Sequence, residues 1–229
     1  MAKGNAAAAA ATNSDRDPSP QRKSTLVLFV RHGQTPTTGA KLPGRAPGLH
    51  LAAKGRRQAI RAANRIKRLD NVAAVYASPM ERTQETAEPI AAALGLPVRT
   101  ERGLIECDFG EWTGADLGEL RKLPEWRQVQ RYPSGFRFPG GESFAEMQQR
   151  MVDAVSGLRE AHVGSTIVAV SHADTIKAAV AHALGTHLDL FQRIVVSPCS
   201  ISAVQYTDEG PVVLAVNSTG NNLKRLVPS

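Results

Sequence analysis

The sequence feature that most constrains the fold is a run of five apolar residues over 26–30, which ends directly in Arg31 and His32. The run has no polar alternation, and this is typical of a strand that is covered on both faces in the middle of a parallel sheet. In such sheets ligands bind beyond the carboxyl ends of the strands. We therefore expect the two polar side chains to open onto a crevice at that end of the sheet.

The rest of the chain repeats this step from an apolar strand to an amphipathic helix. The predicted elements are, in chain order, a helix over 52–69, a strand over 71–79, a helix over 80–95, a short strand near Val98, a helix over 142–162, a strand-to-helix step over 165–185 and a hairpin over 200–218. This alternation predicts a three-layer α/β/α fold with a mainly parallel sheet and an antiparallel edge.

The 229 residues suit one large domain. Residues 1–24 combine an alanine run with Asn, Ser, Asp and Pro, which predicts a disordered tail, so the single folded domain is expected over 25–229. Within it, residues 113–141 are rich in Gly, Pro, Arg and aromatic residues, and we interpret them as a lid-like excursion with two short helices.

Lysine and arginine outnumber aspartate and glutamate by 28 to 21, which favours anionic partners. The basic residues are dispersed and aromatic residues make up only 5% of the chain, so we expect no nucleic-acid partner. No apolar run approaches the roughly 18 residues of a membrane span, and no signal peptide is evident. These observations predict a cytoplasmic protein without a membrane partner and leave the oligomeric state open.

Cys107 and Cys199 lie far apart and have no further cysteine partners, so the sequence supports neither a disulfide framework nor a thiolate metal site. The histidines and carboxylates also lack any spacing that is typical of metal ligands. We expect no metal.

Three predicted strands end close to basic residues. Arg31 and His32 follow the first strand, Arg82 lies in the first helical turn after the second, and His172 follows the strand over 165–171. If these strands are neighbours, two arginines and two histidines converge, while Gly33 lets the backbone approach closely. Such a pocket suits a phosphoryl group, because a guanidinium pairs with two phosphate oxygens at once.

Four segments, "LFVRHGQT", "ASPMERTQETA", "LIECDFGEWTG" and "AVSHADTIK", occur in an order that resembles the histidine phosphatase superfamily. This superfamily includes the cofactor-dependent phosphoglycerate mutases and the acid phosphatases. The resemblance covers residues 25 to 220, and it is closest to the phosphoglycerate mutase-like branch.

The resemblance implies that His32 is the nucleophile, that Arg31, Arg82 and the catalytic His172 bind the phosphoryl oxygens, and that Glu106 is the proton donor. It also implies that no metal and no other cofactor is required. A neutral imidazole is a competent nucleophile near pH 7. A proton-donating carboxyl needs a raised pKa, which an apolar environment around Glu106 would provide.

Four further residues have predicted roles around the pocket. Gly33 and Thr38 are predicted to bind phosphate, although Thr38 stands where the family often has Asn. Arg45 is a candidate for substrate binding, with a solvated surface position as the equal alternative. Asp174 stands where many members have glycine, and we expect its carboxylate to cap the following helix.

Two other segments remain open to interpretation. The basic residues of 113–141 indicate either a substrate with more than one anionic group or a solvated helix face. The segment "PGGESF", residues 139–144, also matches the family, but a turn that starts a helix capped by Ser143 explains it without chemistry.

The function that these residues favour is metal-independent hydrolysis of a small phosphorylated metabolite through a phosphohistidine intermediate. A phosphoglycerate mutase would use the same catalytic residues, and it is the first alternative. A module that binds an anion or a nucleic acid without turnover is the second.

Overall fold

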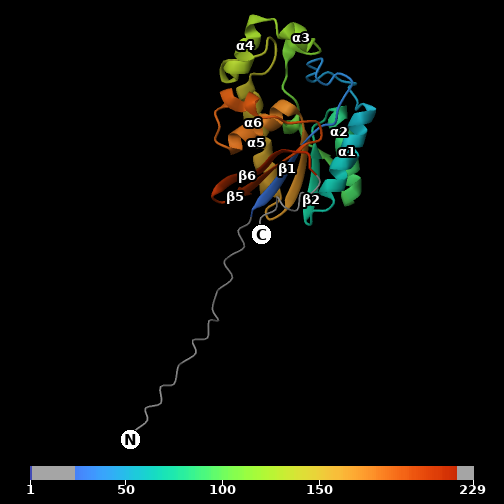
Figure 1. Ribbon diagram of the computed structural model, residues 1–229, viewed down its shortest axis with the longest axis vertical. Helices are drawn as coiled ribbons and strands as arrows, with labels where there is room; N and C mark the ends of the chain where they lie inside the picture. Colours follow the sequence, from blue (N-terminus) through green and yellow to red (C-terminus); the bar gives the residue numbers. More distant parts are fainter. Residues whose placement is uncertain (2–23, 221–229) are drawn as a thin grey trace.

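The computed structural model describes Met1 and residues 24–220 of the chain (Figure 1). The predicted tail over 1–24 therefore lies almost wholly outside the described residues. The helices and strands are β1 (Thr25–Arg31), α1 (Ala53–Ile66), β2 (Val72–Ala77), α2 (Glu81–Leu94), β3 (Val98–Thr100), α3 (Leu117–Leu120), α4 (Pro124–Arg131), α5 (Phe144–Ala161), β4 (Thr166–Ser171), α6 (Ala173–Ala183), β5 (Ile201–Thr207) and β6 (Gly210–Ser218).

The strands form one sheet in the order β3-β2-β4-β1-β5-β6. β1 and β2 both pair in parallel with β4, and β3 pairs in parallel with β2. β5 is antiparallel to β1, and β6 is antiparallel to β5. The predicted mixed sheet is thus confirmed, with β2, β4 and β1 as direct neighbours.

Helices cover both faces of this sheet. Leu26, Leu28 and Val30 of β1 pack in the same core cluster as α1 and α2, whereas Val27 and Phe29 pack in the cluster that contains α5 and α6. All five side chains are buried. This explains why β1 shows no polar alternation, because each of its faces is covered by a helical layer.

The helix ends follow local sequence signals in most places. Gly95 ends α2 in a left-handed conformation with φ 67°, and Ser143 starts α5 with a capping box to Glu146, both as predicted. The predicted end of the first helix at 69 is wrong, because α1 ends at Ile66. The chain turns there into β2 through Asn71, whose φ is +62°.

Residues 113–141 contain α3 and α4, and the predicted pair of short helices is confirmed. Figure 1 shows both helices beyond the end of the sheet where β1 finishes. They are held there by a cluster of buried side chains that is rich in aromatic rings: Phe109, Trp112, Leu120, Val129, Phe136, Phe138 and Phe144. The excursion is therefore packed on its own small core, next to the carboxyl ends of the strands.

Candidate active site

His32 lies just after β1, and its backbone is fixed by β4. Its N–H donates to the carbonyl of Ser171 at 2.9 Å, and its ring Nδ1 lies 2.8 Å from the carbonyl oxygen of Gly33. A carbonyl only accepts, so Nδ1 carries the proton and Nε2 keeps its lone pair. Burial, together with the guanidinium groups of Arg82 and Arg31, lowers the pKa of His32 well below its usual range. The ring is therefore neutral and able to act as a nucleophile.

His172 follows β4 and lies next to His32, with 5.3 Å between the ring centroids. The register of β1 and β4 pairs Arg31 with Ser171, so the two histidines leave the sheet side by side. The His172 ring is fully buried; its Nε2 lies 2.8 Å from Ser78 Oγ and its Nδ1 3.2 Å from Arg82 Nη2. Burial, followed by the charge of Arg82, lowers the pKa of His172 well below its usual range.

Arg82, which is fully buried, and Arg31, which is partly buried, bring two positive charges to these histidines. Arg82, in the first turn of α2, is fully buried, and its Nη2 donates to Gly44 O at 2.8 Å. Its Nε and Nη1 have no hydrogen-bond partner among the described residues, and the same is true of Arg31 Nε. Burial lowers the pKa of both side chains, but arginine stays protonated in proteins. Buried, charged and unpartnered donors indicate a site for an anion.

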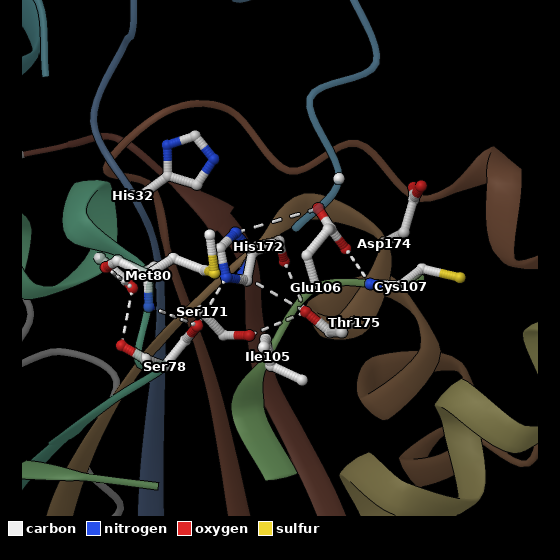
Figure 2. A network of polar contacts seen from close by, with 12 residues as sticks. His32, Ser78, Met80, Ile105, Glu106, Cys107, Ser171, His172, Asp174 and Thr175 are labelled. Carbon is white, nitrogen blue, oxygen red and sulfur yellow. Dashed lines mark hydrogen bonds and ion pairs between the residues drawn. The ribbon is translucent and has the colours of Figure 1, made fainter. Parts of the chain in front are cut away.

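Glu106 lies on the other side of His172 from His32, as Figure 2 shows, with its Oε2 3.9 Å from His172 Nδ1. Its Oε1 accepts a hydrogen bond from the Cys107 N–H at 2.9 Å. Burial, and next the carboxylate of Asp174, raises the pKa of Glu106 to about 7. The carboxyl group is therefore protonated in an appreciable fraction of molecules near neutral pH, as a general acid requires.

Asp174 does not cap α6, so that prediction is wrong. The N–H of His172, at the N-cap position, instead donates to Thr175 Oγ1 at 3.3 Å, and Asp174 pairs with Lys177 Nζ at 3.1 Å. The reason is that Asp174 is the second residue of α6, where its side chain can reach the lysine on the same helical face.

Gly33 is required by close backbone packing. A Cβ on Gly33 would lie 2.6 Å from the carbonyl oxygen of Gly55 in α1, and a Cβ on Gly55 would lie 2.1 Å from Gln34 O. The Gly33 N–H donates to Thr86 Oγ1 at 3.0 Å. The loop after the nucleophile is thus pressed against α1 and α2 by two glycines.

Thr38 and Arg45 are placed differently from the residues above. Thr38 Oγ1 accepts a hydrogen bond from the Thr35 N–H at 2.8 Å, so it closes the turn that follows Gly33. Arg45 donates from Nε to the carbonyl of Glu106 at 2.8 Å and pairs with Glu142 at 2.8 Å. Phosphate binding by Thr38 and substrate binding by Arg45 both stay predictions.

Ser78 and Ser171 were not singled out from the sequence. Ser78 holds His172 Nε2, while Ser171 Oγ donates to Leu104 O at 2.7 Å and so ties the segment before Glu106 to β4. Both serines are fully buried at strand ends. A small polar residue at the end of an otherwise apolar strand is the signal that could have identified them.

A cavity of about 230 Å³ lies between the excursion and the start of α6. Its apolar wall includes Phe109, Trp126 and Phe138, and its polar wall includes Asp174 and Lys177. Asp174 thus lines the cavity, and its charge also acts on Glu106. Within residues 24–220, no group of three or more His, Cys, Asp or Glu side chains is placed to hold a metal ion.

Residues 27–219 match the family model of the histidine phosphatase superfamily (branch 1), and the chain therefore belongs to this superfamily. The bifunctional protein Rv2228c of Mycobacterium tuberculosis is 34% identical over 200 residues, which cover 86% of this chain and 54% of that protein. The chain thus spans about half the length of this curated relative.

Two further proteins are similar over most of their length. Phosphoserine phosphatase 1 of Hydrogenobacter thermophilus is 32% identical over 198 residues, which cover 84% of this chain and 92% of that enzyme. The crystal structure of phosphoserine phosphatase from Entamoeba histolytica in complex with 3-phosphoglyceric acid matches with a TM-score of 0.78 at 26% identity, covering 87% of this chain and 100% of that one. Among the described residues, no helix combines the length and the apolar character that crossing a membrane requires.

Proposed function

We propose that this protein is a phosphatase that hydrolyses a small phosphomonoester through a phosphohistidine intermediate. The observation that carries the proposal is the neutral His32 ring beside buried guanidinium donors that have no partner among the described residues. The phosphoserine phosphatase names of two similar proteins support the same reaction class.

In the first step, the lone pair of His32 Nε2 forms a bond to phosphorus as the bond between phosphorus and the alcohol oxygen breaks. Glu106 gives its proton to the departing oxygen, so the alcohol leaves neutral. In the second step, Glu106 takes a proton from water, the water oxygen attacks phosphorus, and the bond to Nε2 breaks to release phosphate. His32 and Glu106 both adjoin His172, so a phosphoryl group bound beside His172 would lie within reach of both the nucleophile and the acid, as in-line displacement requires.

Arg31 and Arg82 would stabilise the charge that spreads over the phosphoryl oxygens during both steps. The full burial of Arg82 and the partial burial of Arg31 make this stabilisation stronger than it would be in water, because the surrounding dielectric constant is low. His172, held by Ser78, would complete the ring of groups around the same oxygens once its Nδ1 takes a proton and exchanges its contact with Arg82 for a phosphoryl oxygen. These residues supply the positive charge that a metal ion provides in many kinases.

The alcohol part of the substrate would enter the cavity next to Asp174. Aromatic side chains such as Trp126 form one wall, while Lys177 and Gln192 offer polar contacts on the other. A cavity of about 230 Å³ with both kinds of wall suits a compact polar metabolite that has an apolar portion.

Hydrolysis of p-nitrophenyl phosphate in the presence of EDTA tests the proposal. We expect turnover that survives chelation, is abolished in His32→Ala and falls strongly in Glu106→Ala, since the water step needs the carboxylate. Acid-labile label on the wild-type chain after mixing with ³²P-labelled substrate would identify the intermediate. Turnover in His32→Ala at the wild-type rate would overturn the mechanism.

The alternatives predict different results in the same assays. A phosphoglycerate mutase would transfer the phosphoryl group between positions of phosphoglycerate after priming with 2,3-bisphosphoglycerate, with little release of phosphate. A binding module without turnover would retain phosphate and release no nitrophenol.

A further inference from the structure

Outside the reacting groups, a cluster of charged side chains converges on the segment that carries Glu106. Glu142, just before α5, accepts hydrogen bonds from Arg45 Nη2 at 2.8 Å and from Arg150 Nε at 2.9 Å. Its Oε2 also accepts from the Asp108 N–H at 3.0 Å. One carboxylate therefore links two guanidinium groups to the loop over 103–108. We call Arg45, Glu142 and Arg150 the clamp.

The clamp holds the backbone on both sides of Glu106. Arg150 Nη1 donates to the carbonyls of Gly103 at 2.7 Å and Ile105 at 2.9 Å, while Arg45 Nε donates to the carbonyl of Glu106 itself at 2.8 Å. These carbonyls belong to a segment that is neither helix nor strand at Glu106, so no regular backbone ladder fixes it. The clamp replaces that ladder with charge-assisted hydrogen bonds.

Glycines let the two segments come into direct backbone contact. A Cβ on Gly141 would lie 2.3 Å from Asp108 O, and a Cβ on Gly110 would lie 2.0 Å from Pro139 O. The Glu142 N–H also donates to Asp108 O at 2.9 Å. The "PGGESF" segment therefore does more than start α5, because it presents Glu142 to the loop of the proton donor.

We propose that Arg45, Glu142 and Arg150 are positioning residues that aim the Glu106 carboxyl at the leaving oxygen, an inference that rests on the proposed phosphatase function. The cluster is only partly buried, with 29%, 17% and 23% of the three side chains exposed. Two carboxylates, Glu142 and Asp108, balance the two guanidinium charges. The clamp can thus fix the backbone of Glu106 without adding net charge beside it.

Comparing substrates with different leaving groups shows whether the clamp positions the acid Glu106 or only stabilises the fold. An alkyl alkoxide is a poor leaving group that needs a proton, whereas p-nitrophenolate leaves without one. The constant kcat/KM depends only on the steps up to transfer of the phosphoryl group to His32. It is therefore insensitive to the second step, in which Glu106 acts as a base. A misplaced acid therefore lowers kcat/KM for an alkyl phosphate selectively.

The experiment measures kcat/KM for phosphoserine and for p-nitrophenyl phosphate in Glu142→Gln, Arg150→Lys and Arg45→Lys. We expect a loss of about tenfold or more for phosphoserine and less than about threefold for p-nitrophenyl phosphate, as small displacements of catalytic groups cost up to about 10²-fold. For Glu106→Gln we expect an even larger difference between the loss of kcat/KM for phosphoserine and the loss for p-nitrophenyl phosphate. Arg45→Lys, at the most exposed position of the clamp, provides a folded variant if Glu142→Gln does not fold.

Glu146→Gln is the matched control, because Glu146 lies in the first turn of α5 and pairs with the exposed Arg137. We expect it to leave both constants unchanged. Equal losses for the two esters in the clamp variants, or no loss in any of them, would overturn the positioning role while His32→Ala stays inactive. Activity in His32→Ala would instead overturn the proposed function itself.

Discussion

At the scale of single residues, Arg82 is unusual because it is fully buried and only Nη2 of its guanidinium has partners among the described residues. Burying such donors is costly unless a ligand satisfies them. Arg65 offers a comparison, since it is also buried and only its Nε lacks a partner among the described residues, while its Nη1 and Nη2 donate to Ser218 at 2.9 and 2.8 Å. Arg65 thus supports the strand end, whereas Arg82 contacts His172.

We expect Arg82→Lys to lower kcat/KM for p-nitrophenyl phosphate by about 10²-fold, because lysine keeps the charge but loses the planar fork. Inhibition by inorganic phosphate should weaken in parallel. Arg65→Lys should lower the free energy of unfolding and leave kcat/KM within about twofold of wild type. Similar kinetic losses in the two variants would contradict the assignment of Arg82 to the phosphoryl oxygens.

At the scale of elements, the contact between α1 and the loop after β1 fixes the position of His32. Gly33 and Gly55 meet there with no room for a side chain, whereas Gly157 in α5 is exposed and has open space where a Cβ would be. Gly55 is therefore required because no side chain fits there, whereas Gly157 has room for one.

Gly55→Ala should lower the free energy of unfolding by about 1–3 kcal/mol and reduce kcat, because its Cβ displaces Gln34 and the nucleophile loop. Gly157→Ala should raise the free energy of unfolding by about 0.5–1 kcal/mol, since alanine is the better helix former. Urea denaturation of both variants, together with p-nitrophenyl phosphate assays, checks this pair. A stable and fully active Gly55→Ala would show that the contact is not restrictive.

Local sequence patterns predicted some parts of the candidate site and missed others. The apolar runs of β1, β2 and β4 and the residues that follow them predicted the convergence of His32, Arg82 and His172, because parallel neighbours end at one edge of a sheet. The clamp was not predictable in this way: Arg45 and Glu142 are 97 residues apart, and no periodic pattern links the loop between β1 and α1 to the start of α5. The prediction that Asp174 caps α6 failed because its carboxylate forms an ion pair with Lys177 instead.

At the scale of the whole molecule, buried titratable groups couple the stability of the fold to pH. Glu106 has a pKa of about 7 in the folded protein against 4.5 for an ordinary carboxyl, with burial as the main cause. The folded state therefore binds the proton more tightly than the unfolded state. The stabilisation that comes from protonated Glu106 is fully present below pH 4.5 and is lost as the pH rises through 7.

Glu106→Gln should consequently become more stable relative to wild type as the pH rises from 4.5 to 8, by about 2–3 kcal/mol. Glu146→Gln should give the opposite trend at lower pH, losing stability relative to wild type as the pH rises from about 2 to 4.5 and staying level above that, because the hydrogen bond from Arg137 lowers the pKa of Glu146 to about 2. Urea unfolding at a series of pH values measures both differences. A pH-independent gap between Glu106→Gln and wild type would contradict the raised pKa.

The pairing of β1 with β4 has a consequence for how enzymes of this architecture diversify. His32 and His172 leave two adjacent strands at the same level, so the gap between the rings is tied to the hydrogen-bonded ladder of the sheet. Residues 113–141 line a neighbouring cavity, and they pack in a core cluster that is separate from the two clusters on the faces of the sheet. Transplanting that excursion between relatives should therefore exchange the alcohols they accept while the machinery for PO₃ transfer is inherited intact.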